Sequence, residues 1–331
     1  MKIKNLEIDS PVFLAPMAGI TDYPTRKIVQ SFGSNIVYSE MIATKAIHEK
    51  DFLKNLKKNL LFQNFTKKNI TAIQLAGSDI FLMKEAAKIV EGEGGQIIDI
   101  NMGCPSKKVT GQKAGASLMQ DPKLIRKIIE SIISNVSIPV TIKMRLGWDI
   151  QSPNALEIAL LCQDLGVSLI SVHARFRNQF FKGTPDWSLV RPICEETKIP
   201  VIINGDISDI KSAKKAIELS KASGIMVGRA AIGYPWLISL ISSNLYDSRN
   251  FYEPYGYDFI NLVKKHFMYM ISFYGKEKGL ILARKHLSMY LKRINLSDTL
   301  IKKVLLSFNY INVINLLDTE IKESYLKSLN L

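Results

Sequence analysis

Eight short apolar runs recur along the chain, and each ends in small or polar residues. They begin at Val12, Ile36, Ile70, Ile97, Val140, Leu169, Val201 and Gly224. Most are continuously apolar rather than alternating, as is typical of strands buried on both faces of a parallel sheet. Segments with helical spacing lie between them. The sequence therefore predicts a (β/α)8 or TIM barrel, which takes about 250 residues, rather than a doubly wound open sheet.

Four of the intervening helices have recognisable starts. We expect helices over Asp79–Val90, Asp121–Ile133 and Ser208–Leu219. A fourth should begin at Ser152-Pro153, with serine as the N-cap and proline at the first helical position.

The chain changes character after Tyr246. Residues 247–257 are polar and aromatic and are interpreted as a linker, and the sequence from Phe259 onward has helical periodicity without strand-like runs. We therefore expect two domains: a catalytic barrel over residues 1–245 and an all-helical domain over residues 246–331.

Charge and composition restrict the partners and the compartment. The chain carries 44 Lys and Arg against 30 Asp and Glu, a net charge of +14, which indicates an anionic partner such as nucleic acid or an anionic membrane surface. A general surplus of lysine is the alternative. There is no membrane-spanning apolar run and no secretion signal. Three cysteines and four scattered histidines predict neither a disulfide scaffold nor a metal site, and we expect a cytoplasmic protein.

The polar residues at the strand ends predict an active site, because TIM-barrel sites form at the carboxyl ends of the strands. Gly228-Arg229 and Asn204-Gly205-Asp206 follow the last two strands, where this fold binds phosphate. Gln74 is a buried amide that needs partners, from an aromatic heterocycle or from the protein itself.

Three further residues have reactive side chains. Lys143 ends an apolar strand, so it could hold charge on an anionic cofactor or form a Schiff base. His173 could bind a phosphate or a ring carbonyl, or be a core residue. Cys104 lies between Gly103 and Pro105, in a loop where we expect an exposed and mobile thiol acting as nucleophile or acid. Cys162 and Cys194 are expected to be packing residues.

Together these strand ends resemble the tRNA-dihydrouridine synthase family. The matching motifs are APMAGITD (Ala15–Asp22), SEM (Ser39–Met41), QLAGSD (Gln74–Asp79), DINMGCPSKKV (Asp99–Val109), KMRLGW (Lys143–Trp148), VHARFR (Val172–Arg177), NGDI (Asn204–Ile207), GRAAIGYPW (Gly228–Trp236) and ARKHLSMYL (Ala283–Leu291). The resemblance covers nearly the whole chain and is greatest to the bacterial B-type subfamily, which favours position 17 of tRNA.

The resemblance implies an FMN-dependent enzyme that uses NADPH to reduce the C5–C6 bond of D-loop uridines in tRNA. Flavin N5 would deliver hydride to C6, and Cys104 would protonate C5. The implied FMN contacts are Pro16, Met17, Ala18, Gln74, Lys143, His173, Asn204, Gly205, Asp206, Gly228 and Arg229. Candidate substrate contacts are Asn101, Lys107, Lys108, Arg145, Lys285, Lys292 and Arg293. A monomer without an obligate protein partner or a membrane is expected.

The helix around residues 279–294 is the main expected tRNA contact. Lys285, Lys292 and Arg293 fall roughly on one side, and the apolar residues opposite are Leu280, Leu287, Tyr290, Leu291 and Ile294. We expect the apolar side to dock and the basic side to be free for phosphates; a solvated charged face is the alternative.

Two positions depart from the family pattern. The family usually has Gly-Arg-Thr-Arg where this chain has Ala174-Arg175-Phe176-Arg177, and arginine where this chain has Tyr234. His173 and Arg229 are unchanged, so these differences should affect tRNA contact rather than flavin binding.

Three alternatives stay open from the sequence. They are an FMN barrel reductase of a small molecule, a lyase that uses Lys143 as a Schiff base, and a tRNA-binding protein without catalysis.

Overall fold

Eight parallel strands close into a barrel. The computed structural model describes residues 1–34, 36–48, 70–246 and 251–329. The barrel strands are β3 (Val12–Leu14), β4 (Ile36–Tyr38), β6 (Ile70–Ala76), β7 (Ile97–Met102), β8 (Val140–Arg145), β9 (Leu169–His173), β10 (Val201–Asn204) and β11 (Gly224–Val227). Pairing of β4 with β6 closes the ring, and short β5 (Ile42–Ala43) adds to β6. The predicted fold and all eight strand starts are confirmed.

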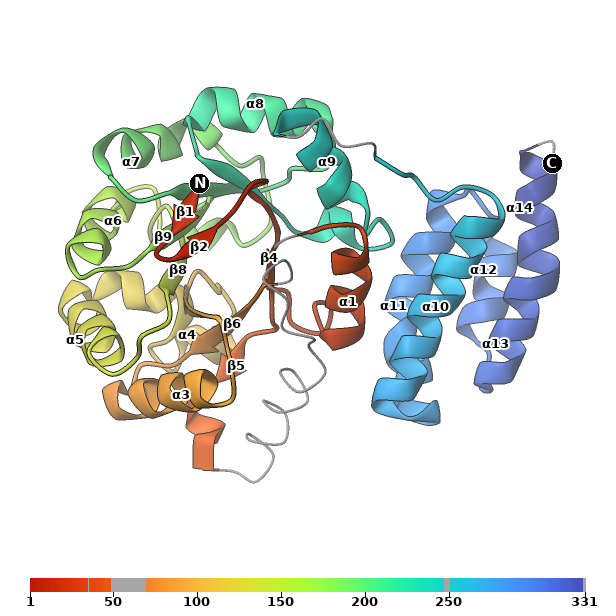
Figure 1. Cartoon of the computed structure of the whole chain (residues 1–331), viewed down its shortest axis with the longest axis horizontal. Coiled ribbons are helices and arrows are strands. Elements are labelled where there is room, and N and C mark those ends of the chain that lie inside the picture. Colours follow the sequence, from red (N-terminus) through yellow and green to blue (C-terminus); the bar gives the residue numbers. More distant parts are fainter. Residues whose placement is uncertain (35, 49–69, 247–250, 330–331) are drawn as a thin grey trace.

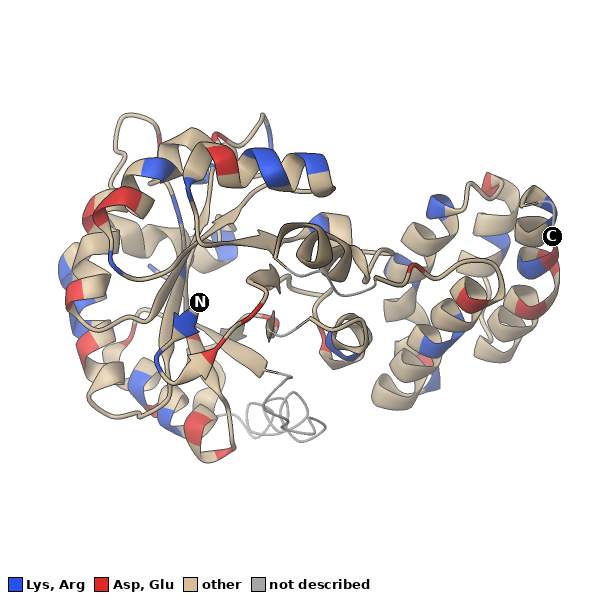
Figure 2. Ribbon diagram, turned by 45° about the horizontal axis from the view of Figure 1, so that its top comes forward, with Lys and Arg blue, Asp and Glu red and all other residues tan. Residues whose placement is uncertain are grey.

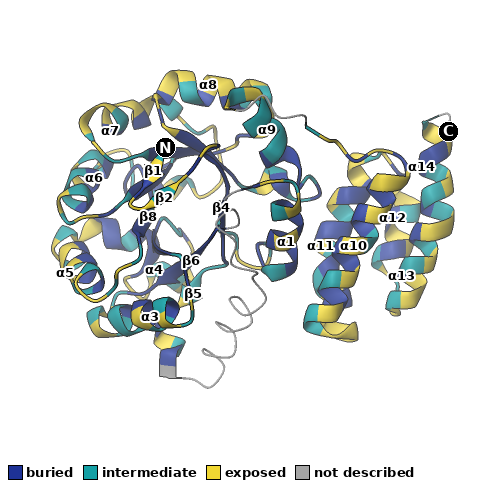
Figure 3. Cartoon of the chain, viewed as in Figure 1, coloured by how far each residue is buried: buried dark blue, intermediate teal, exposed yellow. Residues whose placement is uncertain are grey.

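Helices surround the barrel on the outside (Figure 1). They are α1 (Tyr23–Ser31), α3 (Ile80–Gly92), α4 (Lys107–Thr110), α5 (Pro122–Ile133), α6 (Ala155–Asp164), α7 (Arg191–Glu196), α8 (Ile210–Ser220) and α9 (Leu237–Leu245). The chain that follows β4 lies largely outside the described residues. Figure 3 shows buried strands and exposed outward faces of the helices.

Strand alternation divides the apolar residues between two cores. In β3, Val12 and Leu14 pack outward against the helices, while Phe13 packs inside the barrel beside Tyr38. Ile3 belongs to this inner core, in the antiparallel hairpin of β1 (Lys2–Ile3) and β2 (Leu6–Glu7). The inner core therefore fills the barrel interior and leaves polar side chains at the strand ends.

Aspartate caps fix three of the predicted helices. Asp79 accepts a hydrogen bond from the Leu82 amide, Asp121 from Leu124, and Asp209 from Ser212. The third helix thus begins at Ile210, two residues after the predicted start.

The predicted cap at Ser152-Pro153 is wrong. Helix α6 begins at Ala155, with Asn154 as its N-cap residue. The Ser152 hydroxyl donates to Asp149 instead (2.7 Å), and Pro153 pairs with Gly147 in an isolated bridge. The serine and proline are therefore part of the loop that precedes the helix.

The C-terminal part is helical, as predicted. Its helices are α10 (Tyr257–Tyr274), α11 (Lys276–Arg293), α12 (Asp298–Leu305), α13 (Tyr310–Leu316) and α14 (Lys322–Ser328), with a π-helical turn at Leu317–Ile321. Residues 251–256 of the predicted linker precede α10 without regular structure, and residues 247–250 lie outside the described residues. No helix of the described chain is both long and apolar enough for a membrane span.

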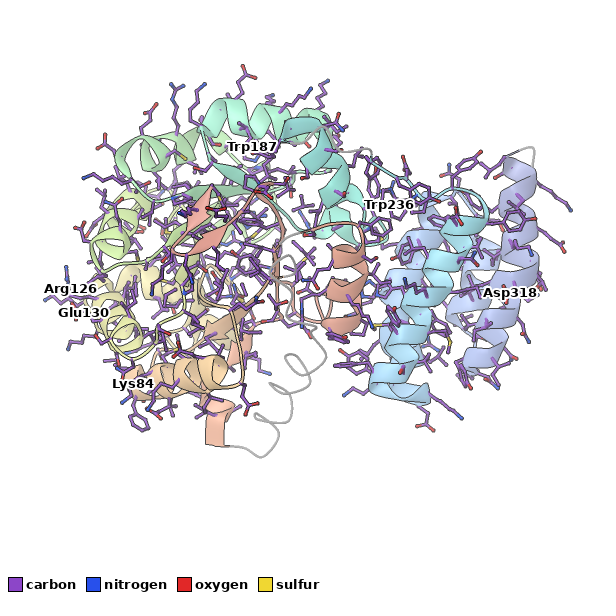
Figure 4. All side chains as sticks on the ribbon, in the orientation of Figure 1. Lys84, Arg126, Glu130, Trp187, Trp236 and Asp318 are labelled. Atoms are coloured by element: carbon purple, nitrogen blue, oxygen red, sulfur yellow. The ribbon has the colours of Figure 1, made fainter. Side chains whose placement is uncertain are left out.

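The helical part packs against the barrel along α1 (Figure 1). Ile28 of α1 and Trp236 before α9 belong to the core of the C-terminal helices; Trp236 lies between the two parts in Figure 4. The Thr25 hydroxyl lies 3.3 Å from Nε2 of both His266 and His286, which are buried. The two parts therefore share apolar and polar contacts.

Candidate active site

A cavity of about 330 Å³ opens at the carboxyl ends of the barrel strands. Nine of the eleven residues predicted to contact a cofactor line it. They are Pro16, Met17, Lys143, His173, Asn204, Gly205, Asp206, Gly228 and Arg229. Ala15, Phe181, Ile207, Ser208 and Ala230 complete the lining. Ala18 and Gln74 are not in the lining: Ala18 lies exposed in the turn after β3, and Gln74 is buried.

Lys143 and Asn204 form one side of this cavity. The Lys143 ammonium donates to Asn204 Oδ1 (3.1 Å), and the Asn204 amide donates to the Met226 carbonyl (2.8 Å), which fixes the orientation of the amide. Burial lowers the pKa of Lys143 to about 8, with nearby Arg145 acting in the same direction. The Lys143 amine is therefore mostly protonated at neutral pH.

His173 is neutral in this site. Burial holds its pKa well below the usual value, and the surrounding Lys143 and arginine charges lower it further. Its Nε2 lies 3.3 Å from an Arg175 guanidinium nitrogen. Because a guanidinium only donates, Nε2 accepts and the ring proton is on Nδ1.

Asp206, which also lines the cavity, links two arginines. It pairs with buried Arg175 and with exposed Arg229, the latter at 2.6 Å. These hydrogen bonds, that of Arg175 first, lower the pKa of Asp206. The carboxylate therefore offsets part of the positive charge and holds both guanidinium groups beside the cavity.

Two glycines bring the backbone to this wall. Gly205 has φ of +131°, and a side chain there would meet Pro185 at 2.9 Å. At Gly228, which also lines the cavity, an added Cβ would lie 3.9 Å from Ala15 and Met17, in ordinary van der Waals contact. Trp187, labelled in Figure 4, donates from its indole nitrogen to the Gly205 carbonyl (2.9 Å). Donors from the backbone and from Arg229 can thus approach the same ligand.

Cys104 lies in the loop between β7 and α4, as predicted, but it is half-buried and its backbone is fixed. Its amide donates to Asn101 Oδ1 (2.9 Å), and its carbonyl accepts from Ala116 (3.0 Å). Arg145 also holds this loop through the Gly103 carbonyl (2.8 Å). The thiol is thus less exposed than expected, and the backbone on both sides of it is hydrogen-bonded.

A buried polar network lies behind Cys104. Asn101 donates to Gln74 (2.7 Å), Gln74 donates to Asp99 (2.6 Å), and the Thr141 hydroxyl donates to the other Asp99 oxygen (2.7 Å). Burial raises the pKa of Asp99 to about 6. Gln74 therefore finds its partners in the protein, the alternative that the sequence left open.

The predicted substrate contacts fall into two groups. Lys107 and Lys108 are exposed on α4, close in sequence to Cys104. Arg145 is buried, and it donates to carbonyls of Gly103, Phe176 and Phe180. Its observed role is to join two loops at the mouth of the barrel.

On α11 the predicted apolar face is buried: Leu280, Leu287, Tyr290 and Leu291 are inaccessible and Ile294 is half-buried. The three basic residues Lys285, Lys292 and Arg293 are exposed, and two of them also contact the barrel part. The Arg293 guanidinium stacks on Tyr234, with Cζ 3.4 Å from the ring centroid. Lys285 lies beside Gly19, where an added Cβ would come within 3.0 Å of its Nζ. Lys292 is exposed.

The residues that depart from the family pattern have clear places. Ala174 and Phe176 are buried in the core between barrel and helices, and Arg177 stacks on Trp148 (4.2 Å). Tyr234 provides the ring under Arg293. Sequence reasoning did not identify Asp99 and Arg175 as site residues. For Asp99, a charged residue inside an apolar strand was the available signal; Arg175 lies just after β9.

The protein is similar in sequence and in fold to known proteins. A "Probable tRNA-dihydrouridine synthase" of Rhodobacter capsulatus is 44% identical over 88% of this chain and 89% of that protein. A "tRNA-dihydrouridine synthase B" of Pasteurella multocida is 37% identical over 89% and 87%. An old yellow enzyme homologue from Zymomonas mobilis has the same barrel fold at 12% identity, with a TM-score of 0.53 over 74% of this chain and 90% of that one.

Another structural neighbour is a complex of 2-naphthoyl-CoA reductase, with a TM-score of 0.58 at 15% identity over 74% of this chain and 51% of that one. The family model of dihydrouridine synthase matches residues 13–324. Because this match covers nearly the whole chain and the relatives are 37% and 44% identical, the protein belongs to the dihydrouridine synthase family.

Proposed function

We propose that this protein reduces the C5–C6 bond of D-loop uridines in tRNA, with bound FMN and with NADPH as reductant. The observation that carries the proposal is the cavity at the strand ends, where Lys143, His173, Asn204 and Arg229 converge. The names of the relatives support tRNA as the substrate.

The residues of the cavity fit FMN. Gly228 brings its backbone to the cavity wall, and the neighbouring Arg229 supplies a guanidinium, a combination that suits a phosphate. Lys143 and Asn204 offer donors that suit the polar edge of a heterocycle. When bound, FMN supplies the hydride that reduces the C5–C6 bond of the uracil ring, with electrons from NADPH.

The protein supplies the proton and the positioning. Cys104 holds the proton that C5 receives, and Asn101 fixes the Cys104 loop through its amide oxygen. Asn101 is held in turn by Gln74, so the network behind it sets the position of the thiol. Lys143 supplies positive charge beside the cofactor, which stabilises the anionic form of the flavin ring.

The positive charges give the affinity for tRNA in this proposal. They are distributed over the barrel and the C-terminal helices (Figure 2). Lys107 and Lys108 lie next to Cys104 in the chain, and Lys285, Lys292 and Arg293 lie on α11. Neutralising tRNA phosphates with such residues makes affinity fall steeply with salt. Arg145 acts as a positioning residue for the loops around Cys104.

The test is an assay with the purified protein, NADPH and an unmodified tRNA transcript, followed by nucleotide-resolution mapping of dihydrouridine. We expect a yellow protein and dihydrouridine at one D-loop position. Cys104→Ala should lower product formation by about 100-fold or more, as for loss of a general acid, with flavin content unchanged. A colourless active protein, a Cys104→Ala variant of normal activity, or a protein that reduces only small molecules would refute the proposal.

A further inference from the structure

A second cavity, of about 430 Å³, lies at the C-terminal end of α11; we call it the linker cavity. The segment before α10, the start of α10, the end of α11 and α14 form its walls. Trp236, Glu253, Tyr255, Arg293, Asn295 and Tyr325 are among its lining residues. Its size is within the range of roughly 300–1,000 Å³ that small ligands occupy.

The linker cavity is aromatic and polar at once. The ring of Tyr325 lies 5.4 Å from Phe259 and 6.5 Å from Tyr255, centroid to centroid. Tyr325 is buried, whereas Tyr255 is 55% exposed. Tyr255 lines the cavity and is exposed enough to be available for stacking.

Polar groups lie around these rings. Glu253 accepts a hydrogen bond from the Trp236 indole (3.2 Å), which fixes the carboxylate at the cavity. Arg293 contributes a guanidinium that stacks on Tyr234. Asn295, just after α11, contributes an amide and has a left-handed backbone conformation (φ +53°). Aromatic faces beside a cation and an amide are how proteins bind unpaired nucleobases.

Helix α11 connects this cavity with the mouth of the barrel. Lys285 adjoins Gly19 in the loop after β3, and Met289 is in contact with Gly233, beyond the end of β11. Arg293 then reaches Tyr234 and the cavity. Eight helical residues separate Lys285 from Arg293, about 12 Å along the axis. An RNA strand lying along α11 can therefore extend from the barrel mouth to the linker cavity.

We propose that the linker cavity binds an unpaired nucleobase of the same tRNA whose uridine enters the barrel. The inference rests on the proposed function and adds a second contact to it. The base stacks on Tyr255, and its phosphate lies near Arg293. Because Glu253 presents a carboxylate that only accepts hydrogen bonds, the bound base must donate to it, from an exocyclic amino group or from a ring N–H.

The test compares Tyr255→Leu with wild type in a tRNA-binding titration. We expect affinity to fall by about tenfold, within the range for one stacked base. Tyr255→Phe keeps a ring and should bind as wild type. Tyr257→Leu is the matched control, because Tyr257 is equally exposed (58%) in the same segment but does not line the cavity. Thermal unfolding checks that each variant is folded.

A second arm identifies the base. Transcripts that lack one unpaired base at a time are titrated against wild type and Tyr255→Leu. At one nucleotide, loss of the base should weaken binding to wild type by the same factor and add nothing in the variant. Equal affinities of wild type and Tyr255→Leu, or additive losses at every nucleotide, would overturn the site. Dihydrouridine formation is measured in parallel: its absence in wild type counts against the proposed function, not against the cavity.

Discussion

Replacing Gln74 by glutamate converts one buried N–H donor into an oxygen and leaves the shape of the side chain almost unchanged. The amide nitrogen of Gln74 lies 2.6 Å from Asp99 Oδ2, and both residues are buried, at 1% and 0% exposure. In Gln74→Glu, two carboxyl oxygens face each other at this separation. They can be accommodated only if the pair retains one proton, because two like charges at such a distance cannot both ionise.

The magnitude follows from proton linkage. Burial already raises the pKa of wild-type Asp99 to about 6. Below that pH, native wild type and native Gln74→Glu each hold one proton more than their unfolded chains. Their stabilities therefore change with pH in parallel. Above it, wild-type Asp99 has ionised while the Gln74→Glu pair still holds its proton. The native variant then binds one extra proton, and its stability relative to wild type falls by about 1.4 kcal/mol per pH unit. From about pH 6 to about pH 8 the difference grows by about 3 kcal/mol.

Urea denaturation over that pH range measures the difference. Gln163→Glu is a matched control: the Gln163 side-chain oxygen accepts from the Lys198 amide at the surface, and glutamate keeps this acceptor. Its profile should parallel that of wild type. A constant gap between Gln74→Glu and wild type across the range would show that Gln74 and Asp99 are not in contact, and the network behind Cys104 would have to be abandoned.

Two further predictions concern the cofactor cavity and the packing of the C-terminal helices. Reduction of the flavin by NADPH should slow as pH rises through about 8, because Lys143 then loses its charge; Lys143→Met should be slow and independent of pH there, and an unchanged profile in stopped-flow measurements would contradict this. Thr25→Val should lower the free energy of unfolding in urea by about 1–2 kcal/mol, since His266 and His286 lose a shared partner. Flavin content should not change, and a variant as stable as wild type would contradict that role.

The barrel could be predicted from the sequence because its signal is local. Most strands are largely apolar runs, and the first residue of each follows a polar or turn segment, so all eight starts were correct. The start of α6 depended instead on competition between two capping residues. Ser152 finds Asp149 within its own loop, and Asn154 becomes the N-cap residue. Such choices depend on contacts three residues away, which a capping preference does not include.

The candidate site was predictable in part for the same reason. Polar residues at strand ends indicated the cavity, because parallel strands bring their carboxyl ends together. The network around Gln74 depends on register, which the sequence does not show. In the structure, Gln74 lies beside Asp99 and Asp99 beside Thr141 on three adjacent strands. Three residues from separate strands thus become neighbours on the inner face of one sheet.

The basic residues of α11 show how tertiary contacts change the meaning of a charge. Helical spacing places Lys285, Lys292 and Arg293 together, and by itself it suggests three equivalent phosphate contacts. In the structure Arg293 stacks on Tyr234, and Lys285 lies against Gly19 with Glu40 nearby. These two cations therefore contact the barrel as well as any RNA, so removing either changes the contact between α11 and the barrel together with the charge. All three side chains are exposed, and Lys292 is the residue whose loss should act through charge alone.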